Sequence, residues 1–354
     1  MVTNRKEIKL SCFYWSLKED LTLVVPSIKG SSGTKSYAEN TIRGLSSLNV
    51  DYRTISVRKI ELSFRGKPYF GIFFQYLQST TKKGQTKVVH ALSPDVVIKG
   101  TDIVTIHDII PFLNPEIYMK SLYDKMAYRL SFGRALQVKT LLLSTETGKG
   151  TFLDRTGIDN SRVKVVHHSI DHEKFFPERF NPYEESNKVK VISVSDFNPR
   201  KRIDVLIDAL GGDKEIDLYH IGPKQGWSSR FEELSRKAKN YENVKLLGPM
   251  DSKKLREYLT FADLFVYLSD NEGFGLPPIE AMACGTNVVV NDLPVFKETL
   301  DDQAYFCKID DFGRDVVMNA IKKRKDPKQL IRFSMRYSIE NHARNLLEVY
   351  KNTS

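Results

Sequence analysis

The sequence predicts an α/β protein of two Rossmann-like domains that face each other across a cleft. The first observation is length, because 354 residues with 41% hydrophobic content exceed the roughly 250–300 residues that one core holds. The second is an alternation of short apolar runs and longer amphipathic stretches, which is typical of a parallel sheet covered by helices. The third is a polar segment at 181–187, which separates two such series and which we interpret as a linker.

The first series predicts a domain over 1–182. It begins with a strand at 21–25, a loop that contains Gly30 and Gly33, and a helix at 36–48. Four further apolar runs are expected to be strands, namely 86–92, 102–107, 138–144 and 163–169. Two helices are expected between them, at 118–134 and 145–156.

The second series repeats this pattern and predicts a domain over 183–336. Its expected strands are 189–195, 216–222, 244–248, 263–269, 287–290 and 304–309. Parallel strands end at one edge of their sheet, and open α/β folds bind ligands at that edge. Two such domains are therefore expected to share a ligand-binding cleft.

The composition limits the classes of partner. A net charge of +10 favours an anionic partner, which could be a nucleic acid, an acidic membrane surface or a phosphorylated ligand. No helix-turn-helix, zinc-ligand or RNA-recognition signature accompanies the charge, so a nucleic-acid-binding protein is the weaker interpretation. Three widely spaced cysteines give neither a disulfide framework nor a metal site. Neither a signal peptide nor an apolar run of about 18 residues is present, which predicts a cytoplasmic protein.

The most informative segment is EGFGLPPIEAMACG, which starts at Glu272 directly after the strand expected at 263–269. Its two glycines let the backbone approach a ligand closely, and its two prolines suit the first turn of a helix. The free N–H groups and the positive dipole end of such a helix suit a phosphate. Glu272 at the entry of the loop and Glu280 in the first turn of the helix could both accept hydrogen bonds from sugar hydroxyls.

This segment resembles the signature of family 4 of the retaining GT-B glycosyltransferases, the group 1 glycosyl transferases. The likeness is closest to the mannosyltransferase-like branch and extends over 104–116, 141–175, 191–210 and 333–351. It implies a GT-B fold in which a helix within 337–354 crosses back to the first domain. It also implies an enzyme that moves a hexose from a UDP- or GDP-linked sugar to an unknown glycan, lipid-linked or protein-linked acceptor, with retention of the anomeric configuration.

The resemblance implies roles for the residues of the signature. Glu280 would hold the nucleotide ribose, and Glu272 would contact hydroxyls of the donor sugar. The backbone N–H groups that would face the sugar and the diphosphate belong to Phe274, Gly275 and Leu276.

Three residues outside the signature also gain roles from the resemblance. Lys201 would neutralise the diphosphate, His107 would line the donor-sugar pocket, and Gly33 would lie in the glycine-rich loop near the diphosphate and acceptor. A cation is the simplest group to stabilise a departing diphosphate where no metal binds. No Asp-x-Asp motif is evident, so no metal and no cofactor is expected. The catalytic candidates are therefore His107, Lys201 and Glu272.

The sequence departs from the family pattern at two places. Ser195-Asp196 stands where Gly-Arg is usual, and an acidic residue there opposes phosphate binding. Either Arg200 binds the diphosphate instead, or Asp196 turns away, or activity is weakened. His168-Ser169 replaces the usual Asn-Gly or His-Gly, which makes the local loop geometry uncertain.

Two alternatives remain open at this stage. Asp196 is compatible with an inactive relative that binds a sugar nucleotide without turning it over. The segment 121–136 mixes basic with apolar residues at helical spacing, which is compatible with a peripheral contact to an anionic membrane. The simpler interpretation of that segment is a helix that packs its apolar side on the first sheet.

Overall fold

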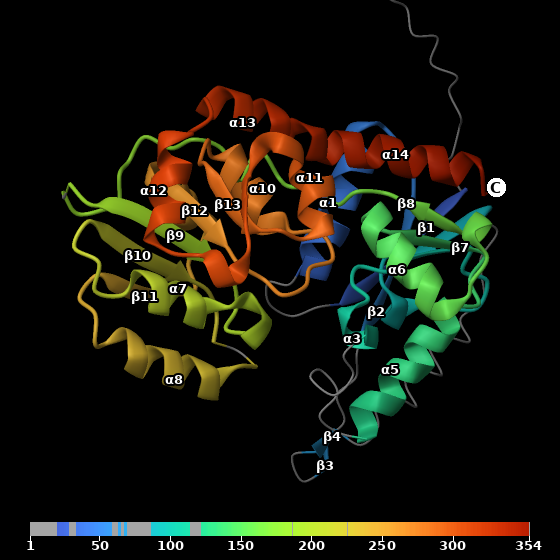
Figure 1. Cartoon of the computed structure of the whole chain (residues 1–354). Coiled ribbons are helices and arrows are strands. Elements are labelled where there is room, and N and C mark those ends of the chain that lie inside the picture. The colour runs from blue at the N-terminus through green and yellow to red at the C-terminus, as the bar shows by residue number, and fades with distance from the viewer. Residues whose placement is uncertain are drawn as a thin grey trace, which may run out of the picture.

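Two parallel sheets of six strands each form the protein, with helices packed around them (Figure 1). The computed structural model describes residues 20–27, 33–58, 63–64, 67–68, 86–113, 122–185, 187–224 and 226–353. The predicted α/β architecture is confirmed. Among the described residues, no helix combines the length and the apolar character needed to cross a membrane.

The first sheet has the strand order β2-β1-β5-β6-β7-β8. Its strands are β1 (Leu21–Ser27), β2 (Arg53–Arg58), β5 (Val88–Ala91), β6 (Ile103–Thr105), β7 (Thr140–Leu143) and β8 (Val163–Val165). The helices of this half are α1 (Gly33–Ser47), α3 (Ile110–Leu113), α5 (Leu122–Ala135) and α6 (Glu146–Thr156). A separate antiparallel pair is formed by β3 (Ser63–Phe64) and β4 (Lys67–Pro68). Each strand predicted in this half is present, and β2 was not predicted.

The second sheet has the strand order β11-β10-β9-β12-β13-β14. Its strands are β9 (Val189–Val194), β10 (Ile216–Ile221), β11 (Val244–Gly248), β12 (Leu264–Tyr267), β13 (Val288–Asn291) and β14 (Tyr305–Cys307). The helices of this half are α7 (Ile203–Leu210), α8 (Ser228–Ala238), α9 (Ser252–Phe261), α10 (Leu276–Ala283), α11 (Pro294–Leu300), α12 (Arg314–Lys322) and α13 (Pro327–Ser334). All six strands predicted here are present.

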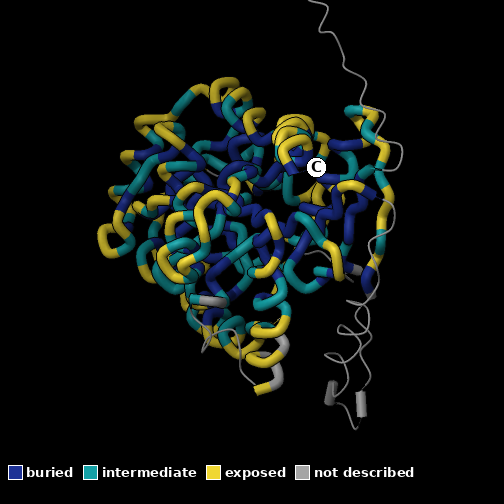
Figure 2. The backbone as a smooth tube through the Cα atoms, turned by 90° about the vertical axis from the view of Figure 1, so that its right-hand side faces the viewer, coloured by how far each residue is buried: buried dark blue, intermediate teal, exposed yellow. Residues whose placement is uncertain are grey.

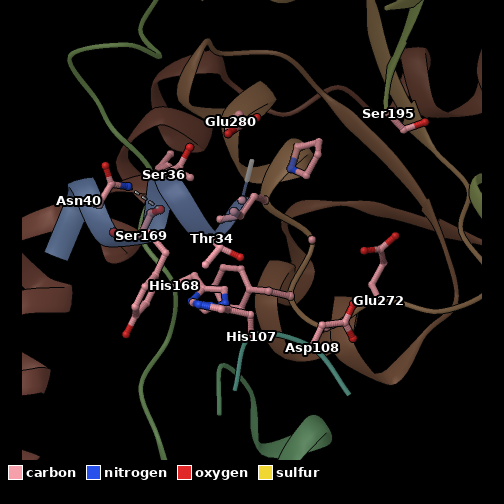
Figure 3. A pocket seen from close by; sticks show the side chains of 18 of the residues that line it. Thr34, Ser36, Asn40, His107, Asp108, His168, Ser169, Ser195, Glu272 and Glu280 are labelled. Atoms are coloured by element: carbon pink, nitrogen blue, oxygen red, sulfur yellow. Dashed lines mark hydrogen bonds between the residues drawn. The ribbon is translucent and has the colours of Figure 1, made fainter. Parts of the chain in front are cut away.

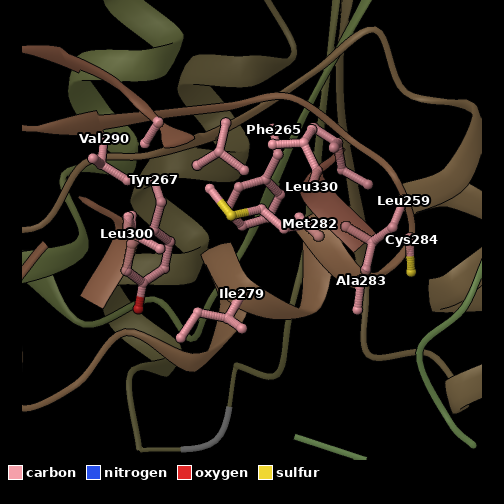
Figure 4. Close-up of a cluster of buried hydrophobic side chains, with 14 of the residues drawn as sticks. Leu259, Phe265, Tyr267, Ile279, Met282, Ala283, Cys284, Val290, Leu300 and Leu330 are labelled. Carbon is pink, nitrogen blue, oxygen red and sulfur yellow. The ribbon is translucent and has the colours of Figure 1, made fainter. Parts of the chain in front are cut away.

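Buried backbone, drawn dark blue, lies mainly inside the molecule, and exposed backbone, drawn yellow, lies mainly on its outside (Figure 2). Strands β5, β7, β12 and β13 are buried at every position, which explains their uninterrupted apolar sequences. One cluster of the second half joins Phe265 and Tyr267 of β12 to Met282 of α10 and Leu330 of α13 (Figure 4). This packing fixes the start of α10 relative to the end of β12.

The helix α14 (Ile339–Lys351) packs against α1 of the first half (Figure 1). The two helices approach closely at Gly44, where a Cβ atom would lie 2.7 Å from the carbonyl oxygen of Ile339. Thr41 Oγ1 and His342 Nε2 are 3.2 Å apart, which adds a polar contact between the two helices.

The segment between the two sheets is not simply solvated. Its described residues form neither helix nor strand, in agreement with the predicted linker at 181–187. Tyr183 is nevertheless buried, and its hydroxyl donates to the carbonyl oxygen of Tyr258 at 2.8 Å. The domain boundary at residue 182 stays a prediction.

The strand orders locate the place where a ligand can enter. In the first sheet the chain reverses its direction of travel across the sheet between β1 and β5, and in the second between β9 and β12. Loops that follow the strands on either side of such a point diverge and leave a crevice. A ligand is therefore expected near the loops that follow β1, β9 and β12.

Candidate active site

A cavity of about 630 Å³ lies between the two halves (Figure 3). Its walls come from the start of α1 and from the loops that follow β6, β8, β9 and β12. Every residue predicted for the site borders it, namely Gly33, His107, Arg200, Lys201, Glu272, Phe274, Gly275, Leu276 and Glu280. Gly30, in the same predicted loop as Gly33, lies outside the described residues. The structure therefore brings the predicted residues together, while their roles stay predictions.

The loop between β12 and α10 brings backbone to the wall of the cavity. Gly275 is the N-cap of α10 with a φ of 87°, a conformation that favours glycine. A Cβ atom there would also lie 2.6 Å from the ring of Phe296. Because Pro277 and Pro278 have no N–H group, the donors at this helix end belong to Gly275 and Leu276. The start of α10 thus combines a positive dipole end with few, defined donors.

Glu272 lies at the centre of a charged cluster in this loop. Its Oε1 atom accepts hydrogen bonds from Arg200 Nη1 at 2.5 Å, from Lys201 Nζ at 2.6 Å and from Ser269 Oγ at 2.6 Å. The hydroxyl of Tyr267 donates to the same atom at 3.1 Å, and Lys201 also donates to that hydroxyl. The side chains of Lys201 and Glu272 are both less than a tenth exposed.

Burial and charge act together on this cluster. At Glu272 burial alone would raise the pKa, but Lys201 and Arg200 outweigh it and hold the pKa below its usual value. Burial lowers the pKa of Lys201, and Glu272 offsets only part of that effect. The pKa of Glu272 is therefore low because one carboxylate faces two cations, whereas the pKa of Lys201 is low because burial, together with the nearby charge of Arg200, outweighs Glu272.

The two cations come from the short 3₁₀ helix η3 (Pro199–Lys201), which follows β9. The side chain of Asn198 caps this helix by accepting from the N–H group of Arg200 at 3.2 Å. The N–H group of Asp270 donates to the Arg200 carbonyl oxygen at 2.8 Å, and Arg200 Nη1 donates to the Asn271 carbonyl oxygen at 2.5 Å. The loops after β9 and β12 are thus held together as one wall of the cavity.

His107 faces this wall from the first half as a neutral imidazole. Its Nε2 donates to the carbonyl oxygen of Leu92 at 2.7 Å, which leaves Nδ1 as the acceptor. Burial lowers the pKa of His107 to about 4. The ring of Tyr37 contacts it edge to face, with centroids 4.6 Å apart. His107 therefore offers the cavity a hydrogen-bond acceptor of fixed orientation.

Asp108 was not predicted as a site residue, although it follows His107 in the sequence. Its Oδ1 accepts from the N–H group of Ile110 at 2.7 Å. Burial, with a smaller contribution from Glu272, raises the pKa of Asp108 to about 6. Asp108 and Glu272 thus border the cavity from opposite halves (Figure 3). Within the described ranges, no three His, Cys, Asp or Glu side chains are grouped so as to hold a metal ion.

Glu280 corrects one detail of the sequence interpretation. We expected it in the first turn of a helix, but α10 starts at Leu276, so Glu280 lies beyond that turn. The sequence did not predict that the helix starts at Leu276, because two consecutive prolines do not determine which residue is the first in the helix. Burial raises the pKa of Glu280 to about 7, and Lys174 offsets part of this effect. At neutral pH this carboxyl group is therefore close to its midpoint of ionisation.

Comparison with known proteins identifies the family. The model of the family described as glycosyl transferases group 1 matches residues 175–332, which contain η3, the Glu272 loop and Glu280. The O-antigen chain mannosyltransferase RfbU of Salmonella typhimurium is 26% identical over 244 residues, which are 69% of this chain and 67% of RfbU. Residues 175–332 of this chain thus match the group 1 glycosyl transferases, the family that the sequence resembles. The chain is a glycosyltransferase that takes its sugar from a nucleotide sugar.

Solved structures show that this glycosyltransferase has the GT-B fold. Sucrose-phosphate synthase from Thermosynechococcus elongatus superimposes with a TM-score of 0.71 at 16% identity, over 94% of this chain and 98% of that one. Anabaena HepE in complex with UDP-glucose superimposes with a TM-score of 0.66 at 14% identity, over 94% and 99%. The predicted fold and family are confirmed.

The first departure from the family pattern lies inside the cavity of this glycosyltransferase. Asp196 borders the cavity, and its Oδ1 accepts from the N–H group of Asn198 at 3.4 Å. The carbonyl group of Ser195, the residue before Asp196, packs directly against Gly222. A Cβ atom on Gly222 would lie 1.7 Å from the Ser195 carbonyl oxygen, so no side chain fits there. Arg200 binds Glu272 in this structure, so its role toward a diphosphate stays a prediction.

The second departure is resolved by the backbone of the glycosyltransferase. Ser169 has no positive φ, so the loop after β8 does not need the glycine that the family usually has there. Asn40 of α1 donates to the Ser169 carbonyl oxygen at 3.1 Å and holds the loop against the first half. His168 is buried and borders the cavity beside His107, with ring centroids 5.4 Å apart.

Sequence reasoning also missed the two partners that Glu272 has on β12 and directly after it. Tyr267 and Ser269 both bind Glu272 Oε1. A signal was present, because the two residues are two positions apart at the end of a predicted strand and so share one face. Without a sheet order, nothing showed which face meets η3.

Proposed function

We propose that this glycosyltransferase moves a hexose from a UDP- or GDP-linked donor to a glycan, lipid-linked or protein-linked acceptor, with retention of the anomeric configuration and without a metal ion. The observation that carries this proposal is the cluster in which Lys201 and Arg200 meet Glu272 beside the start of α10. RfbU is named a mannosyltransferase, and HepE was solved with UDP-glucose, which supports a hexose on a nucleoside diphosphate.

In the proposed reaction, the bond between sugar C1 and the diphosphate oxygen breaks and its electron pair goes to the diphosphate. The oxygen of an acceptor hydroxyl forms the new bond to C1, and its proton passes to the departing diphosphate. Lys201 and the N–H groups of Gly275 and Leu276 stabilise the negative charge that develops. Of the three N–H donors of Lys201, two already bind Tyr267 and Glu272, which leaves one for a phosphate oxygen.

The sugar would lie between the two halves. The hydrogen bonds described for Glu272 all engage Oε1, so Oε2 is the oxygen proposed to accept from sugar hydroxyls. His107 would accept from another hydroxyl through Nδ1, because Nε2 is committed to Leu92. The nucleotide ribose would bind Glu280 at the other end of the cavity.

A donor screen followed by product analysis tests this function. Thermal shifts with UDP-, GDP- and ADP-sugars identify the donor, since a ligand at about one hundred times its Kd adds about 2.7 kcal/mol of stability. The anomeric configuration of the product is then read by NMR, with and without a chelator. We expect retention and unchanged activity with chelator. An inverted product, or activity lost with chelator, would contradict the proposal.

One observation supports a second candidate, a relative that binds sugar nucleotides with little or no turnover. Asp196 borders the cavity where the family places a second cation, and both Lys201 and Arg200 already bind Glu272. Donor binding in the thermal-shift screen, without transfer or donor hydrolysis, would favour this candidate.

The pH dependence of nucleotide binding should report Glu280. An ionised carboxylate accepts hydrogen bonds from ribose hydroxyls better than a protonated one, and the pKa of Glu280 is about 7. Affinity for the free nucleoside diphosphate should therefore be nearly constant above pH 8 and fall as pH drops through 7, by about tenfold at pH 6. Isothermal titration calorimetry at each pH measures this.

The variant Glu280→Gln serves as the reference in that titration, because it keeps the size of the side chain and cannot ionise. It should bind more weakly at pH 8 and show only the pH dependence of the ligand itself. A variant with the same pH profile as the natural protein would assign the titration to another group.

We also propose that α5 makes a peripheral contact with an anionic membrane. Leu122, Met126 and Leu130 recur at every fourth position and are exposed by 75%, 52% and 45%, and the charged Lys125 and Arg129 beside them are exposed too. In agreement with the packing alternative, Phe132 and Ala135 near the end of this helix are buried, and Tyr128 packs on the same core cluster. An apolar stripe with flanking basic residues is suited to an anionic lipid surface.

Sedimentation with lipid vesicles tests this contact. The protein should bind vesicles that contain phosphatidylserine and not vesicles of phosphatidylcholine alone. Met126→Ser should weaken binding, whereas Met335→Ser, which alters a methionine of similar exposure (46%) on another element, should not. Equal binding by both variants would place any membrane contact elsewhere.

A further inference from the structure

We propose that Glu298 is a positioning residue for sugar transfer, because it fixes α6 of the first half against α11 of the second and so holds the loop that carries Glu272. This proposal rests on the proposed function, in which that loop binds the donor. No role was predicted for Glu298 from the sequence, and its carboxylate does not border the cavity.

Glu298 makes a contact that joins the two halves. Its Oε1 accepts from the N–H group of Glu146 at 2.6 Å, and its Oε2 accepts from the N–H group of Thr147 at 2.8 Å and from Thr147 Oγ1 at 2.7 Å. Both N–H groups belong to the first turn of α6, where a negative charge also interacts favourably with the helix dipole. A side chain of one half thus caps a helix of the other half.

The electrostatics of Glu298 agree with this contact. Burial alone would raise its pKa, but His167 and the donors at the start of α6 outweigh burial and lower the pKa to about 2. His167 Nε2 lies 3.6 Å from Glu298 Oε1. The carboxylate therefore stays ionised at any pH at which the enzyme would be assayed.

The start of α6 in turn contacts the loop that carries Glu272. Thr145 is the N-cap of α6, and its Oγ1 donates to the carbonyl oxygen of Gly273 at 3.2 Å. Ser144 Oγ donates to the same oxygen at 3.1 Å. Gly273 directly follows Glu272, so the position of α6 sets the position of the backbone next to this carboxylate.

The helix α11 also contacts this loop directly. Thr299, the neighbour of Glu298, donates through Oγ1 to the Phe274 carbonyl oxygen at 3.2 Å. The consecutive carbonyls of Gly273 and Phe274 are therefore held from α6 and from α11, and Glu298 joins these two helices. Losing the Glu298 contact should loosen both anchors at once and let Glu272, next to Gly273, drift from the sugar.

The variant Glu298→Gln tests this role, because it keeps the shape of the side chain and removes the charge and one acceptor. We expect the kcat for transfer to fall roughly ten- to a hundredfold, as displacement of about 1 Å near reacting atoms does. The Kd of the free nucleoside diphosphate should change much less than kcat, because Lys201 and Glu280, which are proposed to bind it, are not among the partners found for Glu298 in the described part of the chain. Glu233→Gln is the matched control, since Glu233 is 57% exposed and, among the residues that the structure describes, forms an ion pair only with Arg230 of its own helix.

A double-mutant cycle with Ser144→Ala separates positioning from general destabilisation. Ser144→Ala removes one donor to Gly273 without touching Glu298. If both residues act through the same loop, the double variant should lose less kcat than the product of the two single losses. Three results would overturn the proposal. They are losses of kcat that multiply in the double variant, an unchanged kcat in Glu298→Gln, and a fall in nucleoside diphosphate affinity that matches the fall in kcat.

Binding of the intact sugar nucleotide keeps this test independent of turnover. If the natural protein binds donors and transfers no sugar, the proposed function fails, and Glu298 is then judged by affinity alone. Glu298→Gln should weaken the intact sugar nucleotide relative to the free nucleoside diphosphate by about tenfold. An unchanged ratio of these affinities would overturn the positioning role.

Discussion

Replacing Lys201 with alanine should lower turnover about 10²- to 10³-fold, or about 2.7–4 kcal/mol of transition-state stabilisation, by analogy with the loss of an oxyanion donor. Lys201 is the buried cation of the cavity, and its environment has a low effective dielectric in which one charge counts more than in water. Single-turnover kinetics with saturating donor measure the loss in the chemical step. Arg202→Gln, which removes a neighbouring cation paired with Asp270, should have little effect.

The neighbouring charges determine whether Lys201 is the sole cation that stabilises the departing diphosphate. If Arg200 substitutes for the arginine that the family usually has, Arg200→Ala should cost a sizeable part of the Lys201→Ala loss, and Asp196→Arg should restore or raise activity. Arg200 Nη1 already binds Glu272 Oε1 and the Asn271 carbonyl oxygen, so a diphosphate would either compete for it or bind another N–H donor of the guanidinium. Unchanged turnover in Arg200→Ala, with turnover abolished in Lys201→Ala, would show that Lys201 works alone.

Replacing Glu272 with glutamine should destabilise the ligand-free protein by about 3–5 kcal/mol, the usual cost of removing one partner from a buried ion pair. Glu272 is the shared partner of Lys201 and Arg200, and it raises the pKa of Lys201. Its loss should therefore lower that pKa further. Chemical denaturation measures the loss of stability, and kcat should fall as well because sugar hydroxyls lose their acceptor.

The same variant should bind free nucleoside diphosphate at least as tightly as the natural protein. Glu272 competes with the diphosphate for Lys201 and Arg200, so its removal frees both cations for phosphate oxygens. Glu280→Gln should show the opposite behaviour, with weaker binding of the free nucleoside diphosphate and of the sugar nucleotide. Equal losses for both ligands in both variants would contradict the separate assignments of the two glutamates.

The fold was predictable wherever burial leaves a regular pattern in the sequence. Strands β5, β7, β12 and β13, which are buried at every position, are continuous apolar runs. Eleven of the twelve strands that form the two six-stranded sheets were predicted. Strand β2 was missed because it lies at the edge of its sheet, where Arg53, Thr54 and Ser56 are exposed and the apolar run is broken. An exposed edge strand resembles a loop when only its sequence is considered.

The site was predictable where ligand chemistry limits the choice of residue. Glycines, prolines and paired glutamates at a strand–loop–helix junction mark backbone that approaches a phosphate, and these residues do meet in one cavity. The partners of Glu272 and the contacts of Glu298 were not predictable. Glu298 is one acidic residue on a surface helix until the other half of the protein lies against it, and no local pattern encodes that encounter.

The contact between α1 and α14 has a consequence for synthesis of the chain. The Thr41–His342 hydrogen bond joins positions 301 residues apart, and Leu45 of α1 is buried in a cluster with Leu346 and Tyr350 of α14. Translation adds about 5–20 residues per second, so about 15–60 s pass between the synthesis of α1 and the synthesis of α14, the helix that covers it. The second sheet is complete before then, so the half that is translated first should finish folding last. During that interval the apolar side of α1 lacks the cover that Leu346 and Tyr350 give it in the folded protein.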